Sequence, residues 1–180
     1  MFVLRATQRL LARAKPALEA TPAESTTRLG DWCANLLHVG RRQLVLAISS
    51  RTFFPVVVDA APIGSLPARI REATGIGLRS LGISAGPIES ELDEMRDVVW
   101  AKSSSRRATG ILVDFAKALP FYLEDGSSLD AVAAKLADTP IISGSPTALF
   151  PDQATAALFG VDRGSVHRLT TLRAGGTVIT

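Results

Sequence analysis

Residues 29–58 read LGDWCANLLHVGRRQLVLAISSRTFFPVVV, and this stretch decides the fold class. Apolar and β-branched residues dominate three short runs within it, at 32–39, 43–49 and 53–58. Segments rich in Gly, Arg and Ser separate the runs. Short strand-like runs joined by tight turns predict three antiparallel strands in series, a meander.

The first of these runs alternates clearly. Because successive side chains of a strand point to opposite faces, one face carries Trp32, Ala34 and Leu36, and the other carries Cys33, Asn35, Leu37 and Val39. Apolar side chains therefore lie on both faces of the meander. We expect one of these faces to pack against another subunit, which would make the protein a homo-oligomer.

Outside this stretch the chain alternates between strand and helix signals. A strand over 2–5 is followed by a helix from near Thr7, and 98–102 is a short strand candidate. Three serines then precede the longest helix, whose apolar face is Ala108, Ile111, Leu112, Phe115 and Leu119. The pattern predicts an α+β fold in one domain spanning 1–180, with an antiparallel sheet of about three to five strands packed by several helices. It also predicts a flexible loop at 16–27 and a less regular part from about 139.

The composition excludes several classes of protein. Hydrophobic residues make up 47% of the 180 residues and the net charge is +3, which is typical of a globular protein and not of a disordered chain. No apolar run approaches the roughly 18 residues of a membrane helix. A single cysteine, Cys33, favours a reducing compartment, so we expect a cytoplasmic protein. The two histidines have no metal-ligand spacing around them, and no cofactor motif is present, so we expect neither metal nor cofactor.

The first candidate site is the polar entry to the meander. Asp31 and Asn35 could orient a small ligand or a partner's side chain, with Trp32 as a flat wall. The alternative is structural: Asp31 caps a turn or pairs with an arginine, and Trp32 is a core residue.

The second candidate site opens the long helix. Arg106, Gly110 and Asp114 are spaced i, i+4, i+8 and share one stripe, while Lys102 and Ser104 lie where free helix N–H groups point. Glycine inside a helix is unfavourable by about 1 kcal/mol relative to alanine, so close approach of a backbone or ligand would explain Gly110. The alternative is that the serines cap the helix, the arginines are solvated and Gly110 permits packing.

Two further charged features are present. The arginines could bind nucleic acid if they share one face, and the candidates are Arg41, Arg42, Arg51, Arg106 and Arg107. Solvated turns are the alternative. The acidic cluster at 89–97 is interpreted as a solvated helix face.

Two motifs resemble a family of short bacterial proteins described only as a domain of unknown function. LGDWCANL matches its L-G-D-W-x-A-N-L stretch, and Lys102, Arg106, Gly110 and Asp114 match a K-x-x-x-R-x-x-x-G-x-x-x-D stretch. The resemblance spans roughly residues 1–160. Cys33, Arg107 and Val113 depart from the family pattern, and a site that used those positions would be altered here. The family implies no reaction.

The hypothesis that follows is one pocket formed by both motifs, in which Asp31 anchors Arg106 or a ligand cation. We expect a non-catalytic bacterial accessory protein that binds a partner protein or a small anionic ligand there. A toxin–antitoxin or mobile-element setting fits such a protein. The alternatives are nucleic-acid binding, and an enzyme acting on a phosphorylated or nucleotide substrate with Asp31 or Asp114 as the base.

Overall fold

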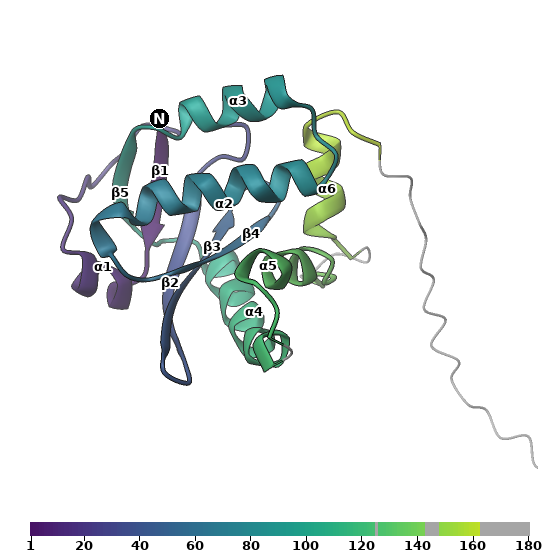
Figure 1. The fold of residues 1–180 in the computed structure, drawn as a ribbon. Coiled ribbons are helices and arrows are strands. Elements are labelled where there is room, and N and C mark those ends of the chain that lie inside the picture. Colours follow the sequence, from purple (N-terminus) through teal and green to yellow (C-terminus); the bar gives the residue numbers. More distant parts are fainter. Residues whose placement is uncertain (125, 143–147, 163–180) are drawn as a thin grey trace, which may run out of the picture.

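The structure is a computed structural model, and it describes residues 1–124, 126–142 and 148–162. Five strands form one open sheet in the order β4-β3-β2-β1-β5 (Figure 1). Their bounds are β1 Phe2–Ala6, β2 Trp32–Val39, β3 Arg42–Ser49, β4 Pro55–Asp59 and β5 Val98–Lys102. The described helices are α1 Gln8–Ala14, α2 Leu66–Ser80, α3 Ala85–Glu94, α4 Arg106–Glu124, α5 Leu129–Ala137 and α6 Pro151–Leu158.

The α+β class is confirmed, but the expectation of a purely antiparallel sheet is wrong. β2, β3 and β4 form the predicted antiparallel meander, whereas β1 lies between β2 and β5 and is parallel to both. The reason lies in the connections. Antiparallel neighbours are joined by tight turns, whereas the chain returns from β1 to β2, and from β4 to β5, through helices that bring it back to the same end of the sheet.

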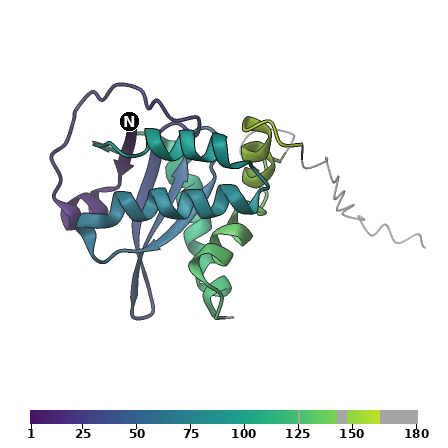
Figure 2. The same ribbon diagram turned by 45° about the horizontal axis from the view of Figure 1, so that its top comes forward.

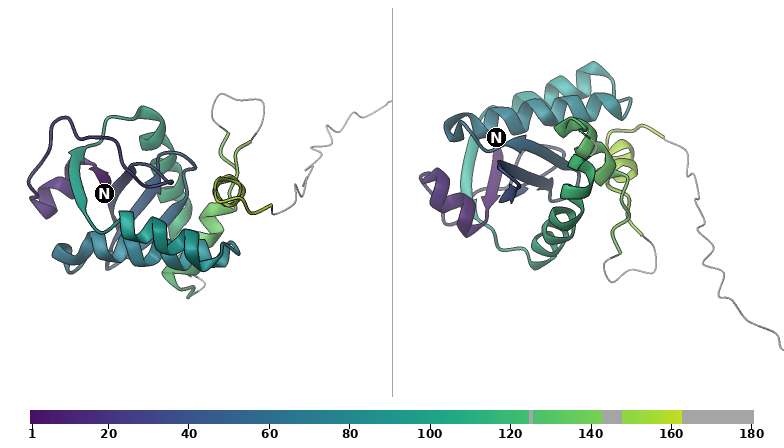
Figure 3. Two further views of the ribbon diagram at one scale, coloured as in Figure 1. Left: turned by 90° about the horizontal axis from the view of Figure 1, so that it is seen from above. Right: turned by 60° about the horizontal axis from the view of Figure 1, so that its bottom comes forward.

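Helices cover both faces of the sheet and make three layers. The first core lies under α2 and α3, and its strand residues include Phe2, Trp32 and Val56. The second core lies under α4 and part of α5, and its strand residues include Cys33 and Leu46. Figure 3 shows the sheet edge-on between these two groups of helices. Because helices of the same chain cover both apolar faces, those faces give no reason to expect a second subunit.

Helix α5 closes the edge of the sheet at β4. It packs against β4, α2 and α4. Its side chains contribute to both cores, since Ala137 belongs to the first and Val132 and Leu136 belong to the second. The edge strand β4 is therefore shielded from pairing with another chain.

The connection between α1 and β2, which contains the predicted loop at 16–27, runs in a wide arc beside the N-terminus (Figure 2). Several contacts attach this connection to the rest of the fold. Leu18 forms an isolated bridge with Trp100, and Thr26 N donates to Met1 O over 3.0 Å. Ser25 and Thr27 are buried. These contacts hold the arc against β1 and β5.

Two further features concern the helical part. α4 continues through Pro120 to Glu124, although a proline inside a helix normally kinks or ends it. The part from 139 contains the helix α6, and its residues 143–147 and 163–180 lie outside the described residues. Among the helices described, none is long and apolar enough to span a lipid bilayer.

Candidate binding site

Asp31 lies at a tight entry to β2. Gly30 precedes it with a φ of +76°, and a Cβ at this glycine would lie 2.6 Å from Ser50 Oγ. Both the backbone conformation and the lack of space require glycine here. Ser50 N donates to Asp31 O over 2.7 Å, which joins this entry to the turn after β3.

The Asp31 carboxylate is held by residues of its own end of the sheet. Arg5 Nε lies 2.6 Å from Oδ2, and Ser25 Oγ donates to Oδ1 over 2.6 Å. Ser25 Oγ also accepts from Val3 N over 2.9 Å. Arg5 is opposite Cys33 in the parallel register, so it shares a face with Asp31. Arg5, and not the hypothesised Arg106, is therefore the ion-pair partner of Asp31.

Trp32 lies on the opposite face of β2 from this ion pair. It is fully buried in the core under α2 and α3. Its indole Nε1 has no hydrogen-bond partner among the described residues. Trp32 is a core residue and cannot form the wall of a pocket that Asp31 lines.

Asn35 and Cys33 belong to the same face as Asp31. Thr7 Oγ1 donates to Asn35 Oδ1 over 2.8 Å, so Asn35 fixes the start of α1. Burial raises the pKa of the Cys33 thiol to about 11, with Arg5 lowering it and Asp31 raising it further. A thiol that stays protonated at neutral pH is a poor nucleophile. The first motif is thus a structural network that joins β1, the arc and β2.

The second motif begins where β5 ends. Lys102 pairs with Ala6 in register, and Ser103 N donates to Ala6 O over 3.0 Å. Lys102 and Ser104 are exposed. Ser105 caps α4, because its Oγ accepts from Ala108 N over 3.2 Å.

A groove of about 310 Å³ runs along α4 against the segment that follows α5, and we call it the α4 groove. Its lining residues on α4 are Arg106, Arg107, Gly110, Ile111, Asp114, Phe115 and Ala118, and on the opposite wall they are Thr139, Pro140, Ile141 and Ile142. Three of the four residues of the second motif therefore line one depression.

The charges in the α4 groove are arranged unevenly. Arg107 lies over the Phe53 ring, with its guanidinium carbon 4.8 Å from the ring centroid. Asp114 is exposed and pairs with Lys117 over 3.3 Å. Arg106 has no ion-pair or hydrogen-bond partner within the described ranges. A Cβ at Gly110 would meet nothing within 4 Å, so no neighbouring protein atom requires glycine there.

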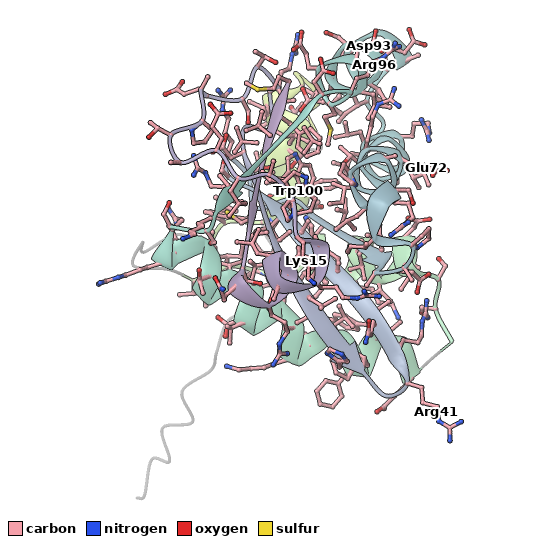
Figure 4. The ribbon with its side chains drawn as sticks, turned by 90° about the vertical axis from the view of Figure 1, so that its left-hand side faces the viewer. Lys15, Arg41, Glu72, Asp93, Arg96 and Trp100 are labelled. Carbon is pink, nitrogen blue, oxygen red and sulfur yellow. The ribbon has the colours of Figure 1, made fainter. Side chains whose placement is uncertain are left out.

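The other three candidate arginines lie at the two ends of β3. Arg41 is at the tip of the β2–β3 hairpin and points away from the body of the molecule (Figure 4). Arg42 pairs with Asp59 over 3.0 Å. Arg51 follows the other end of β3, roughly 26 Å from Arg41 for a strand of this length. These three arginines do not line the α4 groove.

The sequence interpretation missed Glu91, which is buried although it was assigned to a solvated helix face. Its carboxylate accepts from Arg28 N over 2.7 Å and from Leu29 N over 3.0 Å. Burial raises its pKa, against the lowering effect of these hydrogen bonds and of Arg28 and Arg51. A signal was present in the sequence, since Glu91 falls at helical spacing between the apolar Ile88 and Met95. Glu91 holds the loop that leads to Gly30 and Asp31.

Within the part of the chain that the structure describes, no group of His, Cys, Asp and Glu side chains could hold a metal ion.

Comparison with known proteins identifies the family of the chain. The model of the family described as Domain of unknown function (DUF6933) matches residues 3–154. No curated protein and no solved structure matches the chain.

Proposed function

Since this chain belongs to that family of unknown function, we propose a function from the chain's own geometry: it is a non-catalytic module that binds a small anionic ligand with an apolar body in the α4 groove. The observation that carries the proposal is that Arg106, Arg107 and Gly110 share this groove with an apolar floor. Asp31, Trp32 and Asn35 have no part in this site.

The anionic group is accommodated at the start of α4. The first turn of this helix contains no acidic residue and begins with Arg106 and Arg107. The N-terminus of a helix is already partially positive, so two arginines there are unfavourable until an anion balances them. The first-turn N–H groups that Ser105 does not cap and the unpaired Arg106 guanidinium together favour a carboxylate or phosphate.

The apolar body of the ligand is accommodated farther along the groove. Ile111, Phe115 and Ala118 line it on one side and Pro140 and Ile141 on the other. Gly110 keeps the path between the arginines and this floor open. A volume of about 310 Å³ lies at the lower end of small-molecule sites, which favours a compact ligand.

The test is a titration of the full chain, followed by ¹⁵N NMR, with two matched probes, 4-phenylbutyrate and 4-phenylbutanol. We expect the carboxylate to bind more tightly and to shift amide signals of residues 106–118 and 139–142. Arg106→Gln should weaken the carboxylate about three- to fivefold, as loss of one partly exposed charge contact does. It should leave the alcohol unchanged.

A second variant tests the shape of the groove. Gly110→Leu fills the space beside Arg106, and it should abolish binding of both probes while the helix is preserved, because leucine is a better helix former than glycine by roughly 1 kcal/mol. Ser90→Leu is the control, since it also adds a leucine to an exposed helix position, on α3 and outside the α4 groove. Equal affinity for the two probes, or binding that survives Gly110→Leu, would contradict the proposal.

A further inference from the structure

A second cavity lies away from the α4 groove, beside the edge strand β4. Its volume is about 520 Å³, and we call it the β4-edge cavity. Helices α2, α5 and α6 meet around this edge (Figure 1). The size is typical of a site that takes a small organic molecule.

The floor of the β4-edge cavity is apolar. Phe54 and Val56 form it on the strand side, and Ala73, Ile76 and Leu81 form it on α2. Gly77 is required there, because a Cβ would lie 2.7 Å from Cζ of Phe54. The opposite wall is the alanine face of α5, made of Ala131, Ala133, Ala134 and Ala137.

The charged groups at this cavity all have one sign. Asp130, Asp138 and Asp152 line it, and no Lys, Arg or His does. Neither Asp130 nor Asp138 has an ion-pair partner in the described part of the chain. Asp152 Oδ1 accepts from Gln153 N over 2.7 Å.

The two unpaired aspartates lie at opposite ends of α5. Asp130 is in the first turn and Asp138 is the C-cap. They are eight residues apart on one stripe of the helix, which separates their backbones by about 12 Å, with Ala134 midway. Asp138 also adds a negative charge to a helix end that is already partially negative, so a nearby cation would be favourable.

We infer that the β4-edge cavity is a second binding site, and that its ligand is an elongated organic cation with an aliphatic body and an amino group at each end. The alanine wall and the apolar floor contact the aliphatic body. Asp130 and Asp138 each receive one ammonium group. This site has the opposite charge preference to the α4 groove. Either proposal can therefore fail without contradicting the other.

The probes are octane-1,8-diamine, octylamine and octane-1,8-diol, which have the same chain length and two, one or no charges. They are titrated into the full chain and followed by ¹⁵N NMR. We expect the diamine to bind about threefold more tightly than the monoamine, and the diol to bind most weakly. The shifted amides should belong to α2, α5 and the start of β4.

Substitution of each aspartate in turn tests its own contribution to binding. Asp130→Asn and Asp138→Asn should each reduce the affinity for the diamine to that for the monoamine, and neither should change binding of the diol. The control is Glu89→Gln with Asp97→Asn, which removes two exposed carboxylates that do not line the cavity. Ala134→Phe fills the middle of the cavity from an exposed helix position and should abolish binding of all three probes.

Several results would overturn the inference. They are equal affinities for diamine and diol, unchanged diamine binding in both aspartate variants, binding that survives Ala134→Phe, and no amide shifts at α5 up to 10 mM probe. A diamine that shifts the α4 groove residues instead would also overturn it. Binding of 4-phenylbutyrate to the α4 groove is unaffected by any of these outcomes.

Discussion

At the scale of single residues, Asp31 and Trp32 show what an alternating pattern predicts and what it does not. Alternation along 32–39 correctly separates the face of Trp32 from the face of Cys33. The same rule of period two puts Asp31 on the Cys33 face, so the two residues cannot line one pocket. The partner of Asp31, in contrast, depends on the register between β1 and β2. That register joins residues 28 positions apart, such as Arg5 and Cys33, and no local pattern contains it.

Glu91 gives the first prediction at this scale. Glu91→Ala leaves two backbone N–H groups, those of Arg28 and Leu29, without their acceptor. We expect a loss of at least about 2 kcal/mol in the free energy of unfolding, since each unsatisfied buried group costs about 1–3 kcal/mol. Urea denaturation at pH 7 measures it. Glu89→Ala on the exposed face of α3 is the control, and an equally small effect of both changes would contradict the role of Glu91.

The raised pKa of Glu91 adds a pH dependence with a definite sign. The folded state binds the Glu91 proton more tightly than the unfolded chain, whose carboxyl keeps the ordinary value of 4.5. Ionisation of Glu91 therefore lowers stability as the pH rises from 4.5 to the raised pKa of the folded state. Relative to Glu91→Gln, the wild-type protein should lose stability across this window and change no further above it. A difference that stays constant with pH would show that the folded pKa is not raised.

At the scale of elements, the presence of each strand was easier to predict than the strands with which it pairs. The meander and the strand at 98–102 follow from alternation and turn residues, and the structure confirms both. The position of β1 between β2 and β5 could not be predicted, because the pattern of a five-residue strand does not specify its partners. Only one wall of the α4 groove could be predicted from the sequence. The stripe of Arg106, Gly110 and Asp114 is a helical repeat, but its opposite wall comes from residues 139–142, which carry no periodic signal.

Helix α6 gives a prediction at this scale, because a chain of buried hydroxyl groups joins it to the β3–β4 turn. Thr155 Oγ1 donates to Thr52 Oγ1 over 2.7 Å, and Thr52 Oγ1 lies 2.9 Å from Ser49 Oγ. Thr155→Val keeps the shape and removes one hydrogen bond, so we expect a loss of about 1 kcal/mol in unfolding free energy.

Thr109→Val is the matched control for that change. The Thr109 hydroxyl is exposed and donates to Ser105 O within its own helix. Its removal should change the unfolding free energy by less than about 0.5 kcal/mol. Both variants are compared by urea denaturation, and identical midpoints for Thr155→Val and the wild type would show that the hydroxyl chain does not anchor α6.

At the scale of the whole molecule, the two cores are predicted to unfold together, because they share the sheet and α5. Each core has its own reporter. In a Trp100→Phe background Trp32 is the sole tryptophan and reports on the first core, and Cys33 is the sole thiol and reports on the second. Fluorescence of Trp32 and pulse labelling of Cys33 should give the same urea midpoint. Labelling of Cys33 well before the change in fluorescence would show two independently stable layers.

Helix α5 has a consequence for how the two proposed sites communicate. Its alanine face is a wall of the β4-edge cavity, and the residues that continue directly from its end are a wall of the α4 groove. The helix and the residues that follow it therefore lie between the two proposed sites. Because Thr139 follows Asp138 directly, any displacement of the end of α5 would also displace this wall of the α4 groove. If binding at one proposed site displaces α5, each ligand changes the affinity for the other by the same factor.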